Sequence, residues 1–268
     1  MKDVEKQTNP VVWITGASSG IGEACAYEYA RRHCPLVLTS SNRERLEKVA
    51  QKCEKIGTSA EILPFDLHKV EEINRLVEEA WNKHGRLDIV LCNAGISQRT
   101  SVEDTSMEMI HDIMDVNFYA PVAMVKHLLP KMLQQGKGQI AVTTSIAGRF
   151  GFPLRCGYSA SKHALYGFFE TLQAEYGAKG IVTTLVCPGR VQSNISLNAL
   201  DKGGVRHGTM DPGQAGGLPA HKAAQKIVRA IQKGRREVLV GRKELVMVYI
   251  KRFFPGLCAR LAARIKPY

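Results

Sequence analysis

Seven short apolar runs alternate with amphipathic stretches along this chain of 268 residues, and the alternation limits the possible folds more than any other feature. The runs are VVWIT, PLVLTS, AEILPF, LDIVLCN, QIAVTTS, IVTTLVC and EVLVG. Between the second and third runs, apolar residues recur at the spacing of a helix face: Leu46, Val49, Ala50 and Cys53. Strands that are apolar throughout are typical of a parallel sheet covered by helices on both faces. We therefore predict an α/β fold, a single-domain Rossmann-like doubly wound parallel sheet of about seven strands.

No linker rich in Pro or Ser interrupts this alternation, so we expect one dinucleotide-binding and catalytic domain over residues 1–245. One segment departs from the pattern, because residues 203–217 are rich in glycine. We expect a mobile substrate loop there, over residues 194–220, that closes over a ligand. A solvent loop without a role is the alternative. Residues 246–268 then form a separate basic, amphipathic tail.

A glycine-rich turn follows the first apolar run and precedes a helical stretch. Residues 15–22 read TGASSGIG. In such a turn the glycines let the backbone approach a pyrophosphate, and the helix N-terminus offers free N–H groups and partial positive charge. The glycine spacing is GxxxGxG rather than GxGxxG, and an ordinary strand-to-helix turn would also favour glycine. The turn alone therefore leaves cofactor binding and a structural role both open.

Tyr158 and Lys162 are four residues apart in a helical stretch, so their side chains leave the same face. Bringing a tyrosine pKa from about 10 to about 7 requires roughly 4 kcal/mol. A cation about 4 Å away supplies a comparable energy at an effective dielectric near 20. We predict that Lys162 helps Tyr158 to act as a general acid and base. Ser145 ends the run QIAVTTS, at the edge where doubly wound sheets bind ligands, and can hydrogen-bond the substrate oxygen.

These motifs occur in one order with Asn93-Ala94-Gly95 and Pro188-Gly189, and over roughly residues 10–245 the chain resembles the short-chain dehydrogenase/reductase family. The resemblance implies hydride transfer between a nicotinamide cofactor and a carbonyl or secondary alcohol, with Tyr158 exchanging the hydroxyl proton. It implies that Asn117 holds a water near Lys162, and that the assembly is a homo-dimer or tetramer. The cofactor-binding residues that it implies are Gly16, Ser18, Ser19, Gly20, Ile21, Gly22, Asp66, Leu67, Asn93, Ala94, Gly95, Tyr158, Lys162, Pro188, Gly189, Val191 and Ser193.

The end of the second apolar run bears on the choice between NADP and NAD. An acidic residue there would accept the ribose 2′-hydroxyl and repel a 2′-phosphate. The sequence has TSSNR instead, and we expect Ser40, Ser41 and Arg43 to receive the phosphate. NADP (NADPH) is therefore favoured over NAD, although relatives of the NADP-preferring type usually have arginine in place of Ser41. A solvated surface position is the alternative for Arg43.

The segment between Ser145 and Tyr158 is rich in apolar residues: Phe150, Phe152, Pro153, Leu154 and Cys156. We expect them to wall the substrate pocket, which favours a lipophilic substrate. Arg155 in the same segment could equally bind an acidic group, and the apolar residues could serve packing or an oligomer contact. The histidines form no HExxH motif and have no cysteine at ligand spacing, so we expect no metal site.

The basic excess of the chain is concentrated at its end. Of a net charge of +12, +8 falls in residues 233–268, where ten Lys and Arg face only Glu237 and Glu244. A nucleic-acid-binding domain would more often spread such charge along a groove, so we expect no nucleic-acid partner. The tail interleaves apolar residues with Lys251, Arg252, Arg260, Arg264 and Lys266. It could lie on an anionic membrane surface, or dock onto the protein's own body or a neighbouring subunit.

Seven scattered cysteines without a CxxC pair, and an N-terminus without an apolar leader, favour a cytoplasmic protein, with peripheral membrane association left open. The leading hypothesis is an NADP(H)-dependent carbonyl reductase or alcohol dehydrogenase. An NAD-linked alcohol dehydrogenase is the alternative among enzymes. A non-catalytic nucleotide-binding scaffold is the alternative of another class.

Overall fold

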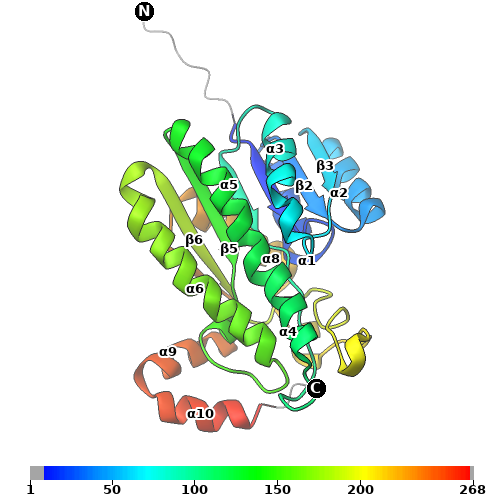
Figure 1. Cartoon of the computed structure of the whole chain (residues 1–268), viewed down its shortest axis with the longest axis vertical. Coiled ribbons are helices and arrows are strands. Elements are labelled where there is room, and N and C mark those ends of the chain that lie inside the picture. The colour runs from blue at the N-terminus through cyan, green and yellow to red at the C-terminus, as the bar shows by residue number, and fades with distance from the viewer. Residues whose placement is uncertain (1–8, 266–268) are drawn as a thin grey trace, which may run out of the picture.

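A parallel sheet of seven strands forms the centre of the computed structural model, which describes residues 9–265 (Figure 1). The strand order is β3-β2-β1-β4-β5-β6-β7, and each pair of neighbouring strands is parallel. The order reverses between β1 and β4, which creates the switch point where sheets of this kind bind ligands. The strands are β1 (Val12–Thr15), β2 (Leu36–Ser40), β3 (Ala60–Pro64), β4 (Ile89–Cys92), β5 (Gly138–Thr143), β6 (Ile181–Pro188) and β7 (Glu237–Val240).

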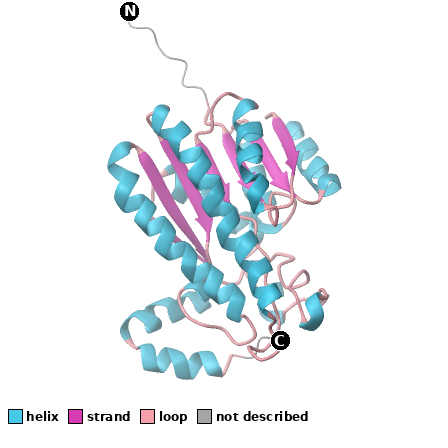
Figure 2. Cartoon of the chain, viewed as in Figure 1, coloured by secondary structure: helices cyan, strands magenta, loops and turns pink. Residues whose placement is uncertain are grey.

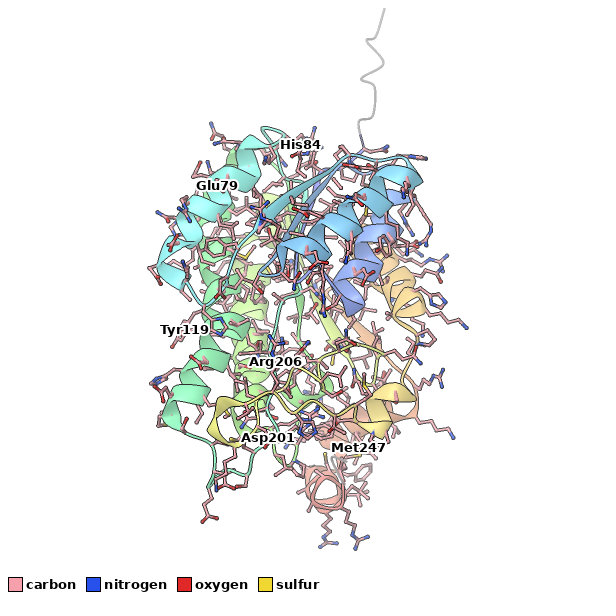
Figure 3. All side chains as sticks on the ribbon, turned by 90° about the vertical axis from the view of Figure 1, so that its right-hand side faces the viewer. Glu79, His84, Tyr119, Asp201, Arg206 and Met247 are labelled. Carbon is pink, nitrogen blue, oxygen red and sulfur yellow. The ribbon has the colours of Figure 1, made fainter. Side chains whose placement is uncertain are left out.

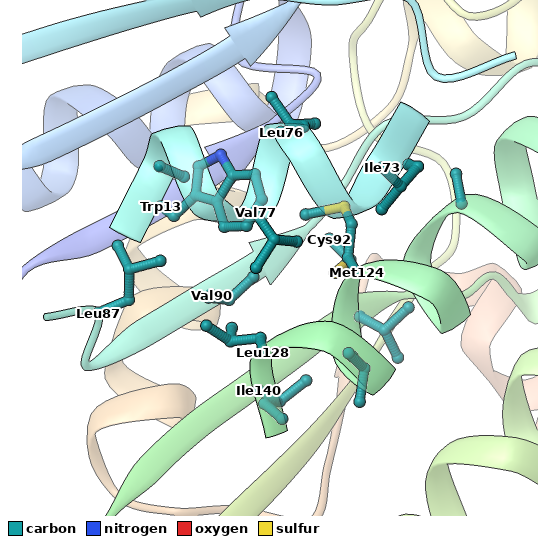
Figure 4. Packing of buried hydrophobic residues seen from close by; sticks show 14 of the residues in the cluster. Trp13, Ile73, Leu76, Val77, Leu87, Val90, Cys92, Met124, Leu128 and Ile140 are labelled. Carbon is teal, nitrogen blue, oxygen red and sulfur yellow. The ribbon is translucent and has the colours of Figure 1, made fainter. Parts of the chain in front are cut away.

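Helices cover both faces of the sheet, which confirms the predicted fold class (Figure 2). Successive residues of a strand point to opposite faces, so Trp13 of β1 enters one core while Val12 and Ile14 enter the other. In the first core Trp13 packs near Leu76 and Val77 (Figure 4). The covering helices are α3 (Ile73–Asn82), α5 (Ala120–Gln134) and α6 (Cys156–Tyr176) on that face, and α1 (Gly20–Ala30), α2 (Arg43–Ile56) and α8 (Ala220–Gln232) on the other.

The local sequence explains where α2 begins and which side it buries. The side chain of Asn42 accepts a hydrogen bond from the backbone N–H of Arg45 at 2.8 Å, which caps the first turn. The helical stripe predicted from the sequence is the buried face of this helix: Leu46, Val49, Ala50 and Cys53. All seven cysteines of the chain are free thiols in the structure.

The segment over residues 194–220, whose mobility stays a prediction, contains some secondary structure. It contains a 3-10 turn (Lys202–Gly204) and the short helix α7 (Pro212–Ala215). Leu200 pairs with the loop after β4, because its N–H donates to the Ser97 carbonyl at 2.8 Å and its carbonyl accepts from the Arg99 N–H at 2.7 Å. These two bonds attach the segment to the loop after β4. The glycine content of the segment did not predict this attachment.

The basic tail forms two helices, α9 (Val246–Phe253) and α10 (Pro255–Ala263), at the end of the molecule toward which the strands point (Figure 1). Their inner side joins an apolar cluster that includes Cys258, Phe150 and Phe152. Residues 266–268, with Lys266 among them, and residues 1–8 lie outside the described part of the chain. Between residues 9 and 265, no helix combines the length and the apolar character that crossing a membrane requires.

Candidate active site

The glycine-rich turn joins β1 to α1 and leaves no room for side chains at two positions. A Cβ on Gly16, whose φ is +63°, would lie 2.8 Å from the Cα of Ala94. A Cβ on Gly22 would lie 2.2 Å from the carbonyl oxygen of Gly16. Ser19 at the N-cap of α1 makes no side-chain capping bond, so this helix end is open to an anion. The turn therefore has the shape and polarity of a phosphate-binding loop.

Asn93 ties the turn to the sheet. Its side-chain amide donates to the carbonyl oxygens of Thr15 and Gly16, at 3.3 and 3.4 Å, and its side-chain oxygen accepts from Thr143 at 3.2 Å. The hydroxyl oxygen of Thr15 accepts from the backbone N–H groups of Asn93 and Ala94. The ends of β1, β4 and β5 are thereby held together at the switch point.

A cavity of about 640 Å³ opens at this edge of the sheet, and most of the predicted site residues line it. They are Gly16, Ser18, Ser19, Gly20, Ile21, Ser40, Ser41, Asp66, Leu67, Asn93, Ala94, Gly95, Ser145, Tyr158, Lys162, Pro188, Gly189, Val191 and Ser193. Three predicted residues do not line it: Gly22, Arg43 and Asn117. Of these, Gly22 supports the cavity indirectly through its packing against Gly16.

The arginine that lines the cavity near the end of β2 is Arg45 of α2 rather than Arg43, and the cofactor role of Arg43 stays a prediction. Arg43 is the first residue of α2, and its guanidinium lies 3.8 Å from Glu47, one turn along the helix surface. Arg45 follows two residues later and lies on the side of α2 that faces Ser40 and Ser41. Residues two apart on a helix point to different sides, so only one of the two arginines lines the cavity.

Tyr158 and Lys162 leave the same face of α6, as their spacing predicts, and both are almost fully buried. The Lys162 ammonium donates to the Thr143 carbonyl at 2.8 Å and lies 5.8 Å from the centre of the Tyr158 ring. The Tyr158 hydroxyl lies beside Ser145, whose hydroxyl oxygen accepts from the Ala147 N–H at 3.1 Å. The three side chains thus meet at the carboxyl ends of β5 and its neighbours.

Asn117 lies behind this group, in a π-helical turn (Asp115–Tyr119). Its side-chain oxygen accepts from the Ile96 N–H at 2.8 Å, and its amide donates to the Ile96 carbonyl and the Ser161 hydroxyl, each at 3.0 Å. A Cβ on Gly95 would lie 3.0 Å from Asn117 Oδ1 and 3.4 Å from Lys162 Nζ. Asn117 therefore braces the wall beside Lys162. Its predicted part in holding a water remains a prediction.

Burial acts on both titratable groups of the pair. It lowers the pKa of Lys162 from 10.5 to about 7. It raises the pKa of Tyr158, against the lowering effects of the Ser145 hydrogen bond and the charges of Arg155 and Arg99. The sequence predicted that Lys162, together with an oxidised nicotinamide, lowers the pKa of Tyr158, and in the structure Ser145 and these two arginines also lower it. No sequence motif marks Arg99 as part of the site, whereas Arg155 lies in the segment before Tyr158 that the sequence predicts to wall the pocket.

Gln98 is a further residue that the motifs do not reveal. Its fully buried side chain accepts from the backbone N–H of Tyr158 at 3.1 Å and donates to Thr100 and Thr105, each at 3.0 Å. It therefore fixes the first turn of α6, on which Tyr158 stands. The signal for this role is that the Gln98 side chain is buried. A single sequence does not show whether a glutamine after a strand is buried or exposed.

The apolar segment before Tyr158 does not wall the cavity, contrary to the sequence expectation. Phe150 and Phe152 pack against each other, with ring centres 4.9 Å apart, and join the cluster under α9 and α10. Of that segment, Arg155 is the residue that lines the cavity. The two phenylalanines do not line the cavity because they pack against the apolar side of the tail helices. Within residues 9–265, no cluster of three or more His, Cys, Asp or Glu side chains is arranged to hold a metal.

Comparison with known proteins agrees with this geometry. Residues 10–202 match the family model for short chain dehydrogenases. The chain is 37% identical over 254 residues to a Xenopus laevis protein called dehydrogenase/reductase SDR family member 7B, covering 92% of this chain and 79% of that protein. An alcohol dehydrogenase from Thermococcus sibiricus, solved with 5-hydroxy-NADP, superposes with a TM-score of 0.75 at 27% identity, over 88% of this chain and 97% of that one.

A short-chain dehydrogenase/reductase from Burkholderia phymatum, solved in complex with NAD, shares the fold with a TM-score of 0.82 at 23% identity, over 97% of this chain and 96% of that one. The family model and the vertebrate relative each cover well over half of the chain. The protein therefore belongs to the short-chain dehydrogenase/reductase family and is an NAD(P)-dependent oxidoreductase.

Proposed function

We propose that this protein transfers hydride between NADP(H) and the carbonyl or secondary alcohol carbon of a lipophilic substrate. The observation that carries the proposal is that Ser145, Tyr158 and Lys162 line the same cavity as the glycine-rich turn. A bound nicotinamide would supply or accept the hydride. The turn fits such a cofactor, because the positions of Gly16 and Gly22 admit no Cβ and the N-terminus of α1 is uncapped.

The protein's own residues manage the substrate oxygen and its proton. Ser145 accepts from the Ala147 N–H, so its own O–H can donate to that oxygen. The Tyr158 hydroxyl, beside Ser145, delivers the proton in reduction and takes it back in oxidation. Lys162 holds its ammonium at the wall through the Thr143 carbonyl, where its charge favours the phenolate form of Tyr158. The same three groups thus serve both directions of the reaction.

Preference for NADP over NAD is part of the proposal, and the polar end of β2 supports it. The hydroxyls of Ser18 and Ser40 lie 2.7 Å apart, and Ser41 and Arg45 line the cavity beside them. The carboxylate of this region, Asp66, follows β3 and hydrogen-bonds His68 at 2.8 Å. Hydroxyls with a guanidinium suit a 2′-phosphate.

Replacing Arg45 by glutamate is expected to lower kcat/KM for NADPH relative to NADH by about tenfold to a hundredfold, since a charge-assisted hydrogen bond contributes roughly 1.5–3 kcal/mol. Steady-state kinetics with each cofactor measure this ratio. Arg43→Glu is the matched control, because Arg43 begins the same helix but lies outside the cavity. An equal change in both variants, or none in Arg45→Glu, would contradict the assignment.

The lipophilic character of the substrate is proposed from the apolar part of the cavity wall, which includes Ile96, Val116, Ile195 and Leu200.

We also propose that the protein is cytoplasmic and forms a homo-dimer or tetramer. The seven free cysteines favour a reducing compartment. The oligomer is proposed by analogy with the family.

Peripheral contact with an anionic membrane through α9 and α10 completes the proposal. Five of the large apolar side chains exposed on the described chain belong to this pair of helices: Val246, Tyr249, Phe253, Phe254 and Leu257. Four cations accompany them, Lys251, Arg252, Arg260 and Arg264, and no acidic residue occurs between residues 245 and 265. Apolar area flanked by cations suits a lipid surface that carries negative charge.

The double variant Phe253→Ser and Phe254→Ser is expected to lose most binding to phosphatidylserine-containing vesicles, since each buried phenylalanine contributes roughly 1.5–3 kcal/mol. Vesicle flotation measures this, with pure phosphatidylcholine vesicles as the neutral comparison. Val102→Ser changes a side chain that is 77% exposed elsewhere and serves as the control. If the double variant changes the oligomer mass instead and the wild type ignores anionic vesicles, the surface is a subunit contact.

A further inference from the structure

Two arginines, Arg155 and Arg206, line the substrate half of the cavity, and a buried pair formed by Arg99 and Asp211 lies against Arg155. Arg155 donates to Asp211 Oδ2 at 3.0 Å, and Arg99 pairs with both oxygens of the same carboxylate. The side chains of Arg99 and Asp211 are only 1% and 5% exposed. One carboxylate therefore balances two guanidinium groups, and one positive charge is left over in a place where an unbalanced charge is costly.

Arg155 shows the consequence of this imbalance. Its Nε is buried and has no hydrogen-bond partner among the residues that the structure describes. Burial, together with the charges of Arg99 and Arg190, lowers the pKa of Arg155 to about 10. Buried donors in proteins are nearly always paired. An unpaired guanidinium donor in a cavity wall is therefore a position where an anionic acceptor would bind favourably.

Arg206 contributes a second cation to the same half of the cavity. It lies on the segment that pairs with the loop after β4, and its guanidinium makes no ion pair or hydrogen bond within residues 9–265. Figure 3 shows Arg206 on the yellow loop that crosses this face of the molecule, with Asp201 on the same loop. Asp201 hydrogen-bonds His207 at 2.9 Å and is not among the residues that line the cavity.

The remaining carboxylate near this half is Asp112 of α4 (Met107–Met114), an exposed residue that also lines the cavity. Apart from Lys162, the charged side chains that line this half of the cavity are Arg155, Arg206 and Asp112, which leaves one net positive charge among these three described residues. Arg155 comes directly before α6 and three residues before Tyr158, about one helical turn away. A group bound to Arg155 would therefore be close to the carbon that reacts.

We propose that the physiological substrate carries an oxyanionic group, such as a carboxylate or phosphate, which binds between Arg155 and Arg206 while its carbonyl oxygen lies at Ser145 and Tyr158. This inference rests on the proposed function and narrows its substrate class. The apolar wall of Ile96, Val116, Ile195 and Leu200 then receives the rest of the molecule. The substrate is an acid with an apolar portion rather than a neutral lipophilic ketone.

A series of linear keto acids tests this, with increasing numbers of methylenes between the keto group and the carboxylate, each paired with its methyl ester. A keto phosphonate paired with its dimethyl ester represents the phosphate class. NADPH oxidation is measured for the wild type, Arg206→Gln and the control Lys222→Gln, which replaces an exposed cation of α8 outside the cavity. Arg206 is exposed, so its replacement leaves the core intact.

For at least one chain length, we expect the wild type to prefer the acid to its ester by about tenfold or more in kcat/KM, the value of one charge-assisted hydrogen bond. The ratio falls toward one in Arg206→Gln, through KM, and stays unchanged in Lys222→Gln. Equal turnover of acids and esters by the wild type, or an unchanged ratio in Arg206→Gln, overturns the anion site and leaves the proposed function standing. Failure to reduce any acid or ester overturns both.

Discussion

Replacing Tyr158 by phenylalanine is expected to lower kcat by about 10²- to 10⁴-fold at neutral pH, the usual contribution of a positioned general acid or base. The change removes the hydroxyl and keeps the ring. Tyr158 is only 6% exposed, so the ring retains its packing on α6. Ser145 and Lys162 remain in place, but neither replaces the lost proton donor, because Lys162 is directed toward the Thr143 carbonyl. Cofactor binding should persist in this variant.

Tyr166→Phe provides the matched control. Tyr166 stands two turns further along the same helix and is also buried, but its hydroxyl bonds Thr144 and Glu237 and does not line the cavity. Its loss should leave kcat within a few-fold of the wild type. Initial rates with a reducible ketone and NADPH measure both variants. A Tyr158→Phe enzyme with a tenth or more of the wild-type kcat would rule out the assigned role.

Replacing Lys162 by methionine is expected to stabilise the protein while it abolishes turnover. Burial lowers the pKa of Lys162 from 10.5 to about 7, so the fold disfavours its charged form. The resulting penalty is on the order of 2–4 kcal/mol at pH 7. Methionine fills the space without a charge, and the lost hydrogen bond to Thr143 offsets about 1 kcal/mol.

The pH dependence of this difference follows from the direction of the shift. The unfolded chain keeps the Lys162 proton up to about pH 10.5, whereas the folded protein releases it near pH 7. The penalty is therefore complete below pH 7 and declines as the pH rises toward 10.5. Between pH 7 and pH 9 the stability advantage of Lys162→Met should fall by about half. Urea unfolding at both pH values measures it, and a variant less stable than the wild type at pH 7 would contradict the account.

The sequence was sufficient for the fold and for the glycine-rich turn, because both depend on local patterns. Continuous apolar runs such as residues 36–40 identify strands buried on both faces, and the stripe from Leu46 to Cys53 identifies the inner side of α2. Tyr158 and Lys162 are four residues apart, and helix geometry alone brings them to one face. Sequence reasoning works well where the residues concerned belong to one element.

Prediction from the sequence was weaker where the position of a side chain depends on contacts between distant segments. Arg43 and Arg45 lie two residues apart on α2 and therefore point to different sides, and Arg45 is the one that lines the cavity. Phe150 and Phe152 could pack either in the cavity wall or against the tail, and they pack against the tail. The tail lies about a hundred residues later in the chain. Asp211 meets Arg99 and Arg155 across 112 and 56 residues. No periodicity or motif in the sequence predicts ion pairs between residues so far apart.

Titration of the purified protein with NADPH, followed by cofactor fluorescence, tests the central claim that the glycine-rich turn and the catalytic residues form one nicotinamide site. Ser19→Asp is the decisive variant. Aspartate is a good N-cap, so it should preserve the stability of α1, while its carboxylate would repel the pyrophosphate. Tyr158→Phe is the companion variant, with the turn left intact.

We predict saturable NADPH binding by the wild type and by Tyr158→Phe. Both proteins should bind NADH with lower affinity than NADPH. Ser19→Asp should lose at least tenfold in affinity without losing thermal stability, since one misplaced charge near the phosphates costs more than about 1.4 kcal/mol. A wild-type protein whose addition leaves the fluorescence of both cofactors unchanged would contradict the account. So would a Ser19→Asp protein that binds NADPH as tightly as the wild type.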